Sequence, residues 1–471
     1  MEMLKTPRRA LQIDNRLREN VMRSNALQEL DAAHLIHPLV NFREHRKRGV
    51  TVLESASGCF LKDTEGNELL DGFAGLWCVN AGYGHESVVE AAANQMRRLP
   101  YATGYFHFGS EPTIQLAAKL AELAPGNLNH VFFTLGGSDA VDTIIRQVRY
   151  FNNAQGKTEK KHFVALQSGF HGSSSTGSGL TALPVFHGGF DVPMPWQHHI
   201  PSPFPYRHDA GDDPGAIIAA SVQTFHDKVD ELGQDNVAAF ICELVQGSGG
   251  VIVPPLGFAT AMQEACRERD VLFIVDEVIT GFGRTGPMFA CEHEGLEPDF
   301  MSVAKGLTSG YAPMGAALMS DHVFDVIADG IPEGRPFGHG FTYSGHPVSA
   351  AVGLEVIKLY EGGLIENSKT VGPYFEERLA EFKDHPLVGD VRSKGLLAAL
   401  ELVADKNTKA RPDPSMQLGP RLQQAGYENG LIFRANADAT MAFAPPICIT
   451  REEVDLLIER VAKTLDAIDW R

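Results

Sequence analysis

An aspartate and a lysine that each follow a short apolar run are the residues in this sequence best placed to do chemistry. Asp276 comes directly after Val271 to Val275, a run rich in β-branched residues that is typical of a strand buried on both faces of a parallel sheet. Lys305 follows a second apolar run, Phe300 to Ala304. Open α/β sheets bind ligands at the carboxyl ends of their strands. The two side chains are therefore expected to face one bound molecule from two strand ends.

Pyridoxal phosphate is the cofactor that uses such a pair. Its aldehyde forms a Schiff base with an amine, which Lys305 supplies. Its pyridine nitrogen must stay protonated for the ring to accept electrons from a carbanion, and a buried carboxylate such as Asp276 favours that charged form. Alone, the pair also fits a simpler interpretation, a strand-end cap and a surface lysine. The surrounding residues decide between the two interpretations.

Three motifs around this pair resemble the signature of the class III aminotransferases, which are pyridoxal phosphate enzymes. The motifs are Asp276-Glu277-Val278, the glycine-rich stretch 281–286 and Ala304-Lys305-Gly306. The resemblance extends from about Phe42 to the C-terminus, and segments 70–80 and 339–347 are most similar to the omega (amine–pyruvate) transaminases. It implies ping-pong transfer of an amino group from an omega-amino acid or primary amine to a keto acid, with pyruvate as the expected acceptor.

The same resemblance implies an α/β fold of fold type I, the architecture of PLP-dependent transferases. We expect a large domain with a mostly parallel seven-stranded sheet and a smaller α/β domain. Residues 1–70 are expected to form an N-terminal part of the small domain, 71–335 the large cofactor-binding domain and 336–471 the rest of the small domain. Stretches 391–401, 431–434 and 441–449 are the expected strands of the small domain, and 58–71 is an expected hairpin.

A glycine-rich turn between a strand and a helix is an expected phosphate site. Val131 to Thr134 is typical of a strand, and apolar residues from Val141 to Val148 repeat with the spacing of one helix face. The turn Gly136-Gly137-Ser138 would leave backbone N–H groups free at the positive end of the helix dipole. We expect Gly137 and Ser138 to bind the cofactor phosphate. A glycine–serine pair before a helix is also an ordinary cap, so this motif is weak by itself.

Four further residues are expected around the cofactor: three follow from the resemblance, and Val278 follows from its spacing, since it is two residues after Asp276 and on the same side of an extended backbone. Phe170 would stack on one face of the pyridine ring, where many relatives carry tyrosine, and Val278 would pack on the opposite face. His171 follows Phe170 and belongs to the same segment. Glu243 ends the apolar run Val237 to Cys242 and would lie near the substrate, where it can pair with a mobile arginine. Phe170 also fits an ordinary core residue, and Glu243 an ordinary capping acid.

Five residues are placed around the substrate by the resemblance. Trp77 would form a wall of the pocket, although a tryptophan flanked by small residues also fits a packed core. Ser248 would line the small side, and Tyr105 and Phe106 would reach the pocket across a dimer interface. Arg434 follows an apolar run, where a charged residue needs a reason. In relatives the matching arginine binds a substrate carboxylate and swings aside for an uncharged amine.

Thr342 matches a threonine that donates a hydrogen bond to the phosphate of the partner subunit. A site shared in this way requires two-fold symmetry. The resemblance therefore implies a homodimer or a dimer of dimers.

The composition narrows the remaining classes. The 471 residues carry a formal net charge of −18, which disfavours nucleic acid or an anionic membrane as partner. No apolar run reaches the ~18–20 residues of a membrane helix. The six cysteines contain no Cys-x-x-Cys motif, so no metal site is expected and reduced thiols in a cytoplasm are the simplest interpretation. Residues 1–11 have no apolar core of a signal peptide and are expected to lack order.

Three other functions stay open at this point. An aminomutase or racemase of the same class would keep all these residues and differ only in whether the product leaves. A nicotinamide-dependent oxidoreductase is suggested by the Gly-x-Gly-x-x-Gly pattern at 281–286, but those glycines do not follow the strand directly and Pro287 comes next. A non-enzymatic binding protein would tolerate the loss of Lys305.

Overall fold

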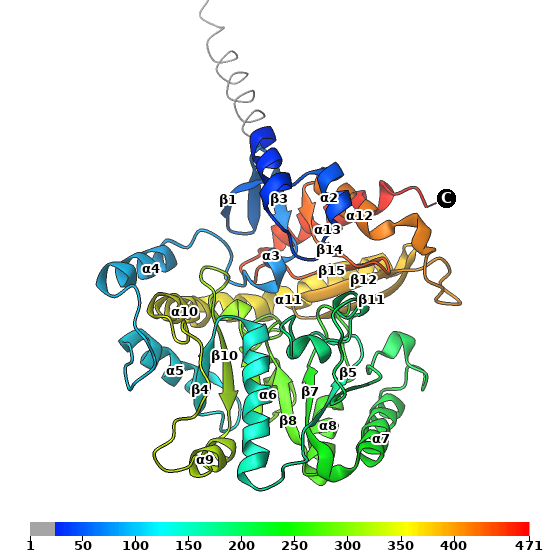
Figure 1. Cartoon of the computed structure of the whole chain (residues 1–471). Coiled ribbons are helices and arrows are strands. Elements are labelled where there is room, and N and C mark those ends of the chain that lie inside the picture. The colour runs from blue at the N-terminus through cyan, green and yellow to red at the C-terminus, as the bar shows by residue number, and fades with distance from the viewer. Residues whose placement is uncertain (1–23, 471) are drawn as a thin grey trace, which may run out of the picture.

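A computed structural model describes residues 24–470 of the chain (Figure 1). The expectation for residues 1–11 lies outside this range. At the centre is a seven-stranded sheet in the order β4-β10-β9-β8-β7-β5-β6. Its strands are β4 His130–Thr134, β5 His162–Leu166, β6 Gln197–Ile200, β7 Val237–Glu243, β8 Leu272–Asp276, β9 Phe300–Val303 and β10 Gly315–Met319. β10 is antiparallel to both neighbours and the other pairs are parallel, which confirms the predicted mostly parallel sheet.

Helices cover both faces of this sheet, so its inner strands are apolar on both sides. Every residue of β7 is buried. Phe240 and Cys242 point into one hydrophobic cluster, and Ala239 and Ile241 point into the other. The helices of this region are α4 Glu86–Arg98, α5 Glu111–Leu123, α6 Gly137–Ala154, α7 Pro214–Leu232, α8 Phe258–Glu268, α9 Asp321–Asp329 and α10 Pro347–Leu359.

Two smaller sheets lie beyond the carboxyl ends of the parallel strands (Figure 1). The first contains β1 Leu53–Ser57, β2 Phe60–Asp63, β3 Glu68–Asp71 and β13 Leu431–Ile432. The second contains β11 Val388–Lys394, β12 Leu397–Leu402, β15 Thr440–Phe443 and β14 Arg434–Ala435. The helices here are α2 Phe42–Arg48, α3 Ala74–Trp77, α11 Ile365–Ala380, α12 Leu418–Glu428 and α13 Arg451–Asp466, and residues 24–34 are also helical.

The expected hairpin at 58–71 is confirmed by the antiparallel pairing of β2 with β3. Three expected strands of the small domain differ from the structure. Gly395, with a φ of +62°, turns 391–401 into the hairpin β11–β12. The stretch 431–434 is divided between two sheets, because β13 pairs with β3 whereas β14 pairs with β15. The stretch 441–449 leaves its strand at Phe443, before two prolines that cannot donate ladder hydrogen bonds.

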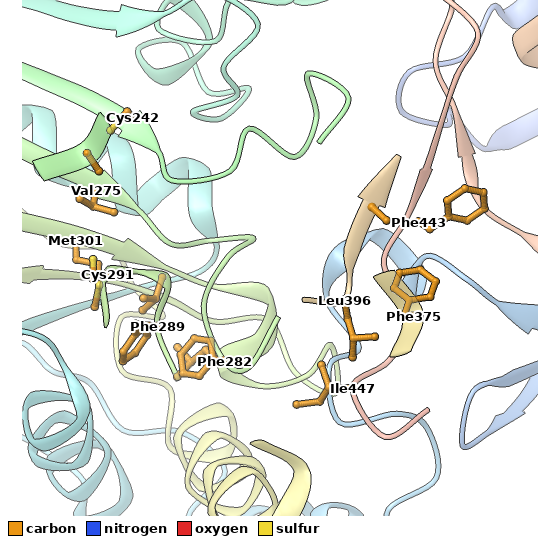
Figure 2. Packing of buried hydrophobic residues seen from close by; sticks show 14 of the residues in the cluster. Cys242, Val275, Phe282, Phe289, Cys291, Met301, Phe375, Leu396, Phe443 and Ile447 are labelled. Carbon is orange, nitrogen blue, oxygen red and sulfur yellow. The ribbon is translucent and has the colours of Figure 1, made fainter. Parts of the chain in front are cut away.

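A continuous apolar core joins the central sheet to the small sheets (Figure 2). On one side lie Cys242, Val275 and Met301 from β7, β8 and β9; on the other lie side chains of the small sheets and α11. Gly283 sits at the junction, where a Cβ atom would lie 2.8 Å from both Ile365 Cδ1 and Ile447 Cδ1. The domain boundaries at residues 70 and 335 stay predictions.

In the described range, no helix combines the length and the apolar character needed to cross a membrane.

Candidate active site

Two acidic residues lie at the ends of neighbouring strands in the candidate site. Glu243 and Asp276 are paired in register at the ends of β7 and β8, so both carboxylates lie at the same edge of the sheet. Asp276 is only 3% exposed. Its Oδ2 accepts a hydrogen bond of 2.9 Å from His171 Nδ1, and its Oδ1 accepts one of 3.1 Å from the backbone N–H of Val278. The Asp276 carboxylate is therefore held in one orientation by two donors.

Lys305 starts a 3₁₀ turn, Lys305–Leu307, directly beyond β9. Its Nζ lies 5.6 Å from the centroid of the Trp77 ring and forms no hydrogen bond within residues 24–470. Burial lowers the pKa of the Lys305 amine, while the carboxylates of Asp276 and Glu243 act in the opposite direction. The net shift favours a free lone pair on Nζ, which a base or nucleophile needs.

The backbone around Lys305 is unusually strained. Lys305 itself has a φ of +42°, Trp77 a φ of +56° and Phe282 a φ of +58°. Non-glycine residues in this region cost about 1–3 kcal/mol each and concentrate at functional sites. Trp77 is buried against Phe73, with ring centroids 4.4 Å apart. The strain supports a functional role for this corner of the fold.

The carboxyl group of Glu243 has a raised pKa. Burial raises the pKa of Glu243 to about 7; His171 acts against this shift, the charge of Asp276 adds to it, and two hydrogen bonds oppose it. The hydrogen bonds come from the backbone N–H groups of Phe170 at 2.8 Å and Gly247 at 3.1 Å. Near neutral pH, the carboxyl group is therefore divided between its neutral and charged forms.

This titration predicts a pH-dependent effect of Glu243→Gln on stability. The folded state holds the proton up to about pH 7 and the unfolded state releases it near 4.5, so the contribution of Glu243 to stability is greatest below 4.5 and is lost as the pH rises through this window. Glutamine is neutral at every pH, so its contribution to stability does not change with pH. In urea unfolding of the cofactor-free protein, the free energy of unfolding of the variant relative to that of the wild type should rise by about 3 kcal/mol between about pH 5 and pH 8. Exposed Glu297→Gln is the control, and parallel pH profiles for Glu243→Gln and the wild type would contradict the prediction.

The N-terminus of α6 fits a phosphate group. Gly136 precedes the helix in extended conformation, and no side chain caps the first turn. No atom lies within 4 Å of where a Cβ atom would be at Gly136, so the space before the helix is open. At Gly137, a Cβ atom would lie 3.0 Å from Val278 Cγ1, so Val278 is brought close to the turn. Ser138 Oγ accepts a hydrogen bond from Ser173 N and keeps its own proton to donate.

Together these groups fit pyridoxal phosphate. An anion-binding turn, an amine with its lone pair favoured and an oriented buried carboxylate converge on one end of the sheet. His171 Nε2 is buried without a hydrogen-bond partner in the described part of the chain. Phe170 is half-buried, and its ring contacts Phe186 edge-on at 5.2 Å. The ring-stacking roles of Phe170 and Val278 stay predictions.

On the Trp77 side of this centre lies a cation, Arg434, that has no ion pair among the described residues. Arg434, at the start of β14, is half-buried, and its Cζ lies 5.1 Å from the centroid of the Trp77 ring. No acidic side chain among residues 24–470 forms an ion pair with it. Burial lowers the pKa of Arg434, while the charges of Asp438 and Glu243 raise it. Ser248 is buried in the turn after β7, between Gln246 and Ile252, whose backbones pair.

Three predicted site residues stay apart from this centre in the single chain. Tyr105, Phe106 and Thr342 are all exposed, Phe106 to 81%. Tyr105 and Phe106 contact each other with ring centroids 5.9 Å apart, and Tyr101 Oη donates a hydrogen bond to the Thr342 carbonyl at 2.9 Å. In the part of the chain that is described, no hydrogen bond or ring contact joins these three to Lys305 or Asp276.

Asn80 and Arg284 lie behind Lys305 and were not predicted from the sequence. Arg284 is fully buried; its Nη2 donates to Asn80 Oδ1 at 2.6 Å, and its Nη1 donates to the carbonyls of Ala444 and Pro445. Burial lowers the pKa of Arg284 to about 10. A Cβ atom at Gly306, next to Lys305, would lie 2.6 Å from Asn80 Nδ2. The sequence gives one indication of this role: Arg284 lies inside a glycine-rich motif, and an arginine buried there needs hydrogen-bond acceptors.

Comparison with known proteins agrees with this geometry. The family model "Aminotransferase class-III" matches residues 42–465. A putrescine–pyruvate aminotransferase from Pseudomonas aeruginosa is 42% identical over 441 residues, covering 93% of this chain and 95% of that protein. An (S)-enantioselective omega-transaminase from Thermomicrobium roseum superposes with a TM-score of 0.92 at 41% identity, covering 95% and 99% of the two chains. An omega transaminase from Pseudomonas jessenii in complex with PMP superposes with a TM-score of 0.91 at 40% identity, covering 93% and 97%.

Proposed function

Because this chain belongs to the class-III aminotransferases, which use pyridoxal 5′-phosphate, we propose that it transfers the amino group of a primary amine or omega-amino acid to pyruvate. The observation that carries this proposal is Arg434, a half-buried cation without an ion pair in the described chain, beside the same ring as Lys305. Such a cation suits the carboxylate of a keto acid.

When bound, the cofactor supplies an electron sink for the donor carbon. The protein supplies the proton transfer and the fixed charges. Lys305 Nζ, with its pKa lowered by burial, would take the proton from the donor carbon and deliver it to the carbon that was the aldehyde of the cofactor. Asp276, oriented by His171, would keep the pyridine nitrogen protonated. The N–H groups of Gly137 and Ser138 would hold the phosphate at the start of α6.

A panel of amines tests the reaction. The loaded enzyme is given a diamine, 4-aminobutyrate, β-alanine or an arylalkylamine with pyruvate, and alanine is measured. We expect alanine from at least one donor and none when pyruvate is omitted. Turnover of an amino compound without any keto acid would instead favour an aminomutase or racemase. If no donor yields alanine although the cofactor is bound, pyruvate is not the acceptor.

Arg434 is proposed as a retractable carboxylate receptor. A fixed buried charge would penalise a donor that lacks a carboxylate, because an unpaired buried charge is costly. A long arginine can pair with pyruvate and withdraw for the amine. We therefore expect Arg434→Ala to slow the half-reaction with pyruvate about 10- to 100-fold, because one charge-assisted contact to the carboxylate is lost. The rate of the half-reaction with an arylalkylamine should change little.

Stopped-flow spectra of the two half-reactions measure this difference directly. Arg451→Ala, which removes an exposed arginine of α13, is the matched control. Equal slowing of both half-reactions in Arg434→Ala would mean that the residue supports the fold or the cofactor, and that the carboxylate receptor lies elsewhere.

The active unit is proposed to be a homodimer, alone or paired as a dimer of dimers. Tyr105, Phe106 and Thr342 are assigned to the site of the neighbouring subunit. Their exposure in the single chain supports this assignment, because exposed apolar side chains that lie side by side, as Tyr105 and Phe106 do, are found at interaction surfaces. A cytoplasmic location is part of the proposal and is motivated by six free cysteines, which suit a reducing compartment.

Mixed dimers test the sharing of sites. Chains carrying Lys305→Ala and chains carrying Thr342→Ala are each expected to be inactive or weak alone. In a hybrid, a shared site collects both lesions in one pocket and leaves the other intact, so about half of the wild-type activity should return per hybrid. The control pairs Lys305→Ala with Asp276→Asn, which lie in the same pocket and cannot complement. Hybrids demonstrated by mass that stay inactive would count against sharing.

A further inference from the structure

Three side chains that can ligate a metal, Asp31, His37 and His45, lie together near the N-terminal end of the described chain. Asp31 belongs to the helical residues 24–34, His37 to the turn after them and His45 to α2. His37 Nε2 lies 2.5 Å from Asp31 Oδ1, and His45 Nε2 lies 2.7 Å from Asp31 Oδ2. All three ligand atoms lie within 4.8 Å of one another. The reaction proposed above uses none of these residues.

The local chain conformation brings the three side chains of this cluster together. The first helix ends where Leu35 N donates to the Asp31 carbonyl, and Leu39 takes a left-handed φ of +55° in the turn that follows. Asn41 then starts α2 by accepting hydrogen bonds from the N–H groups of Arg43 and Glu44. The turn returns His37 and His45 to the same carboxylate, and their rings lie 4.6 Å apart.

Apolar packing does not account for this arrangement in the single chain. α2 contains no buried residue. The large apolar side chains between residues 30 and 42 point to solvent rather than into a core: Leu30, Leu35, Ile36, Leu39, Val40 and Phe42. The Asp31, His37 and His45 side chains are instead 9%, 25% and 14% exposed. The polar cluster is thus the better-shielded part of the segment, yet it stays open enough for an ion to enter.

We propose that Asp31, His37 and His45 bind one divalent transition-metal ion, for which Zn²⁺ is the probe. Two imidazole nitrogens and one carboxylate oxygen are the donor set that zinc takes in three-ligand sites, with water in the fourth position. Zinc at ordinary bond lengths would separate the ligand atoms to about 3.3 Å, a small rotation from the present contacts. Each Nε2 would then use its lone pair, with the ring proton on Nδ1.

Without an ion, the same atoms can satisfy one another through hydrogen bonds from both Nε2–H groups to the carboxylate. The experiment must therefore separate metal binding from this proton-only arrangement. Chelator-treated holoenzyme is titrated with Zn²⁺ alone in a calorimeter, and with Co²⁺ while visible absorption is recorded. The variants are Asp31→Asn and the double variant His37→Gln/His45→Gln. His34→Gln is the matched control, because His34 is exposed on the same helix and lies outside the cluster.

We expect the wild type and His34→Gln to bind one more Zn²⁺ per chain than the cluster variants, and to develop the absorption of four-coordinate Co²⁺. Equal zinc stoichiometry in all four proteins would overturn the proposal. If the variants fail to fold, the wild type still decides the question. Zn²⁺ must then raise its unfolding temperature, as a ligand of the native state does, and Co²⁺ must give the four-coordinate spectrum. If neither effect occurs, the cluster is a hydrogen-bonded triad only.

Discussion

Replacing Lys305 by alanine is expected to lower the rate of alanine formation at least about 10⁴-fold, because this one change would remove both the amine proposed to bond to the cofactor and the proposed proton carrier. The proposed phosphate-binding turn at the start of α6 and the Asp276 carboxylate remain, so the variant should still bind the cofactor. Borohydride reduction of the wild-type holoenzyme, followed by peptide mass mapping, should place the cofactor on Lys305.

The control for this experiment is Lys369→Ala, which removes an exposed lysine of α11. It should keep both the reducible label and the rate. A label on any other lysine of the wild type, or a Lys305→Ala variant with substantial turnover, would show that the amine of the site has been wrongly assigned.

The second large effect is expected from Asp276→Asn. Asparagine keeps the shape and can still meet His171, but it removes the negative charge proposed to hold the pyridine nitrogen protonated. Loss of such a preorganised charge interaction should cost about 3–4 kcal/mol of barrier, or about 10²- to 10³-fold in turnover. Cofactor content should change little, and absorbance spectra measure it alongside the rate.

Asp325→Asn, at an exposed acid of α9, provides the comparison for this substitution. The Asp276 result would be informative in either direction. A variant with near wild-type turnover would mean that the ring nitrogen is not held by this carboxylate. A variant that loses the cofactor altogether would mean that Asp276 chiefly serves binding.

The parts of the site that follow from local sequence could be predicted. An unbroken apolar run of β-branched residues describes a buried strand wherever it occurs, so the carboxyl ends of β7 and β8, and with them Glu243 and Asp276, were accessible from the sequence. The same holds for the turn before α6, because glycines ahead of a helical repeat mark its start.

The parts that depend on distant segments could not be predicted in this way. Nothing local to Asn80 indicates that its carboxamide meets Arg284 and the carbonyls of the 281–282 turn. The stretch 431–434 has the composition of one strand, but its first residues complete one sheet and Arg434 begins a strand of another. Such divisions are decided by which neighbours the rest of the fold makes available.

That division has a consequence for how the protein is made. β3 acquires its neighbour β13 through the pairing of Leu70 with Leu431 and of Asp71 with Ile432, so the N-terminal sheet stays incomplete on the ribosome until nearly the whole chain has emerged. Trp77 lies just after β3 and Arg434 just after β13, so the two sides of the proposed pocket meet at the same late moment. A contact between such distant segments closes slowly. Nascent chains stalled before residue 431 should therefore contain a folded central sheet but no substrate pocket, which makes activity a property of the completed chain.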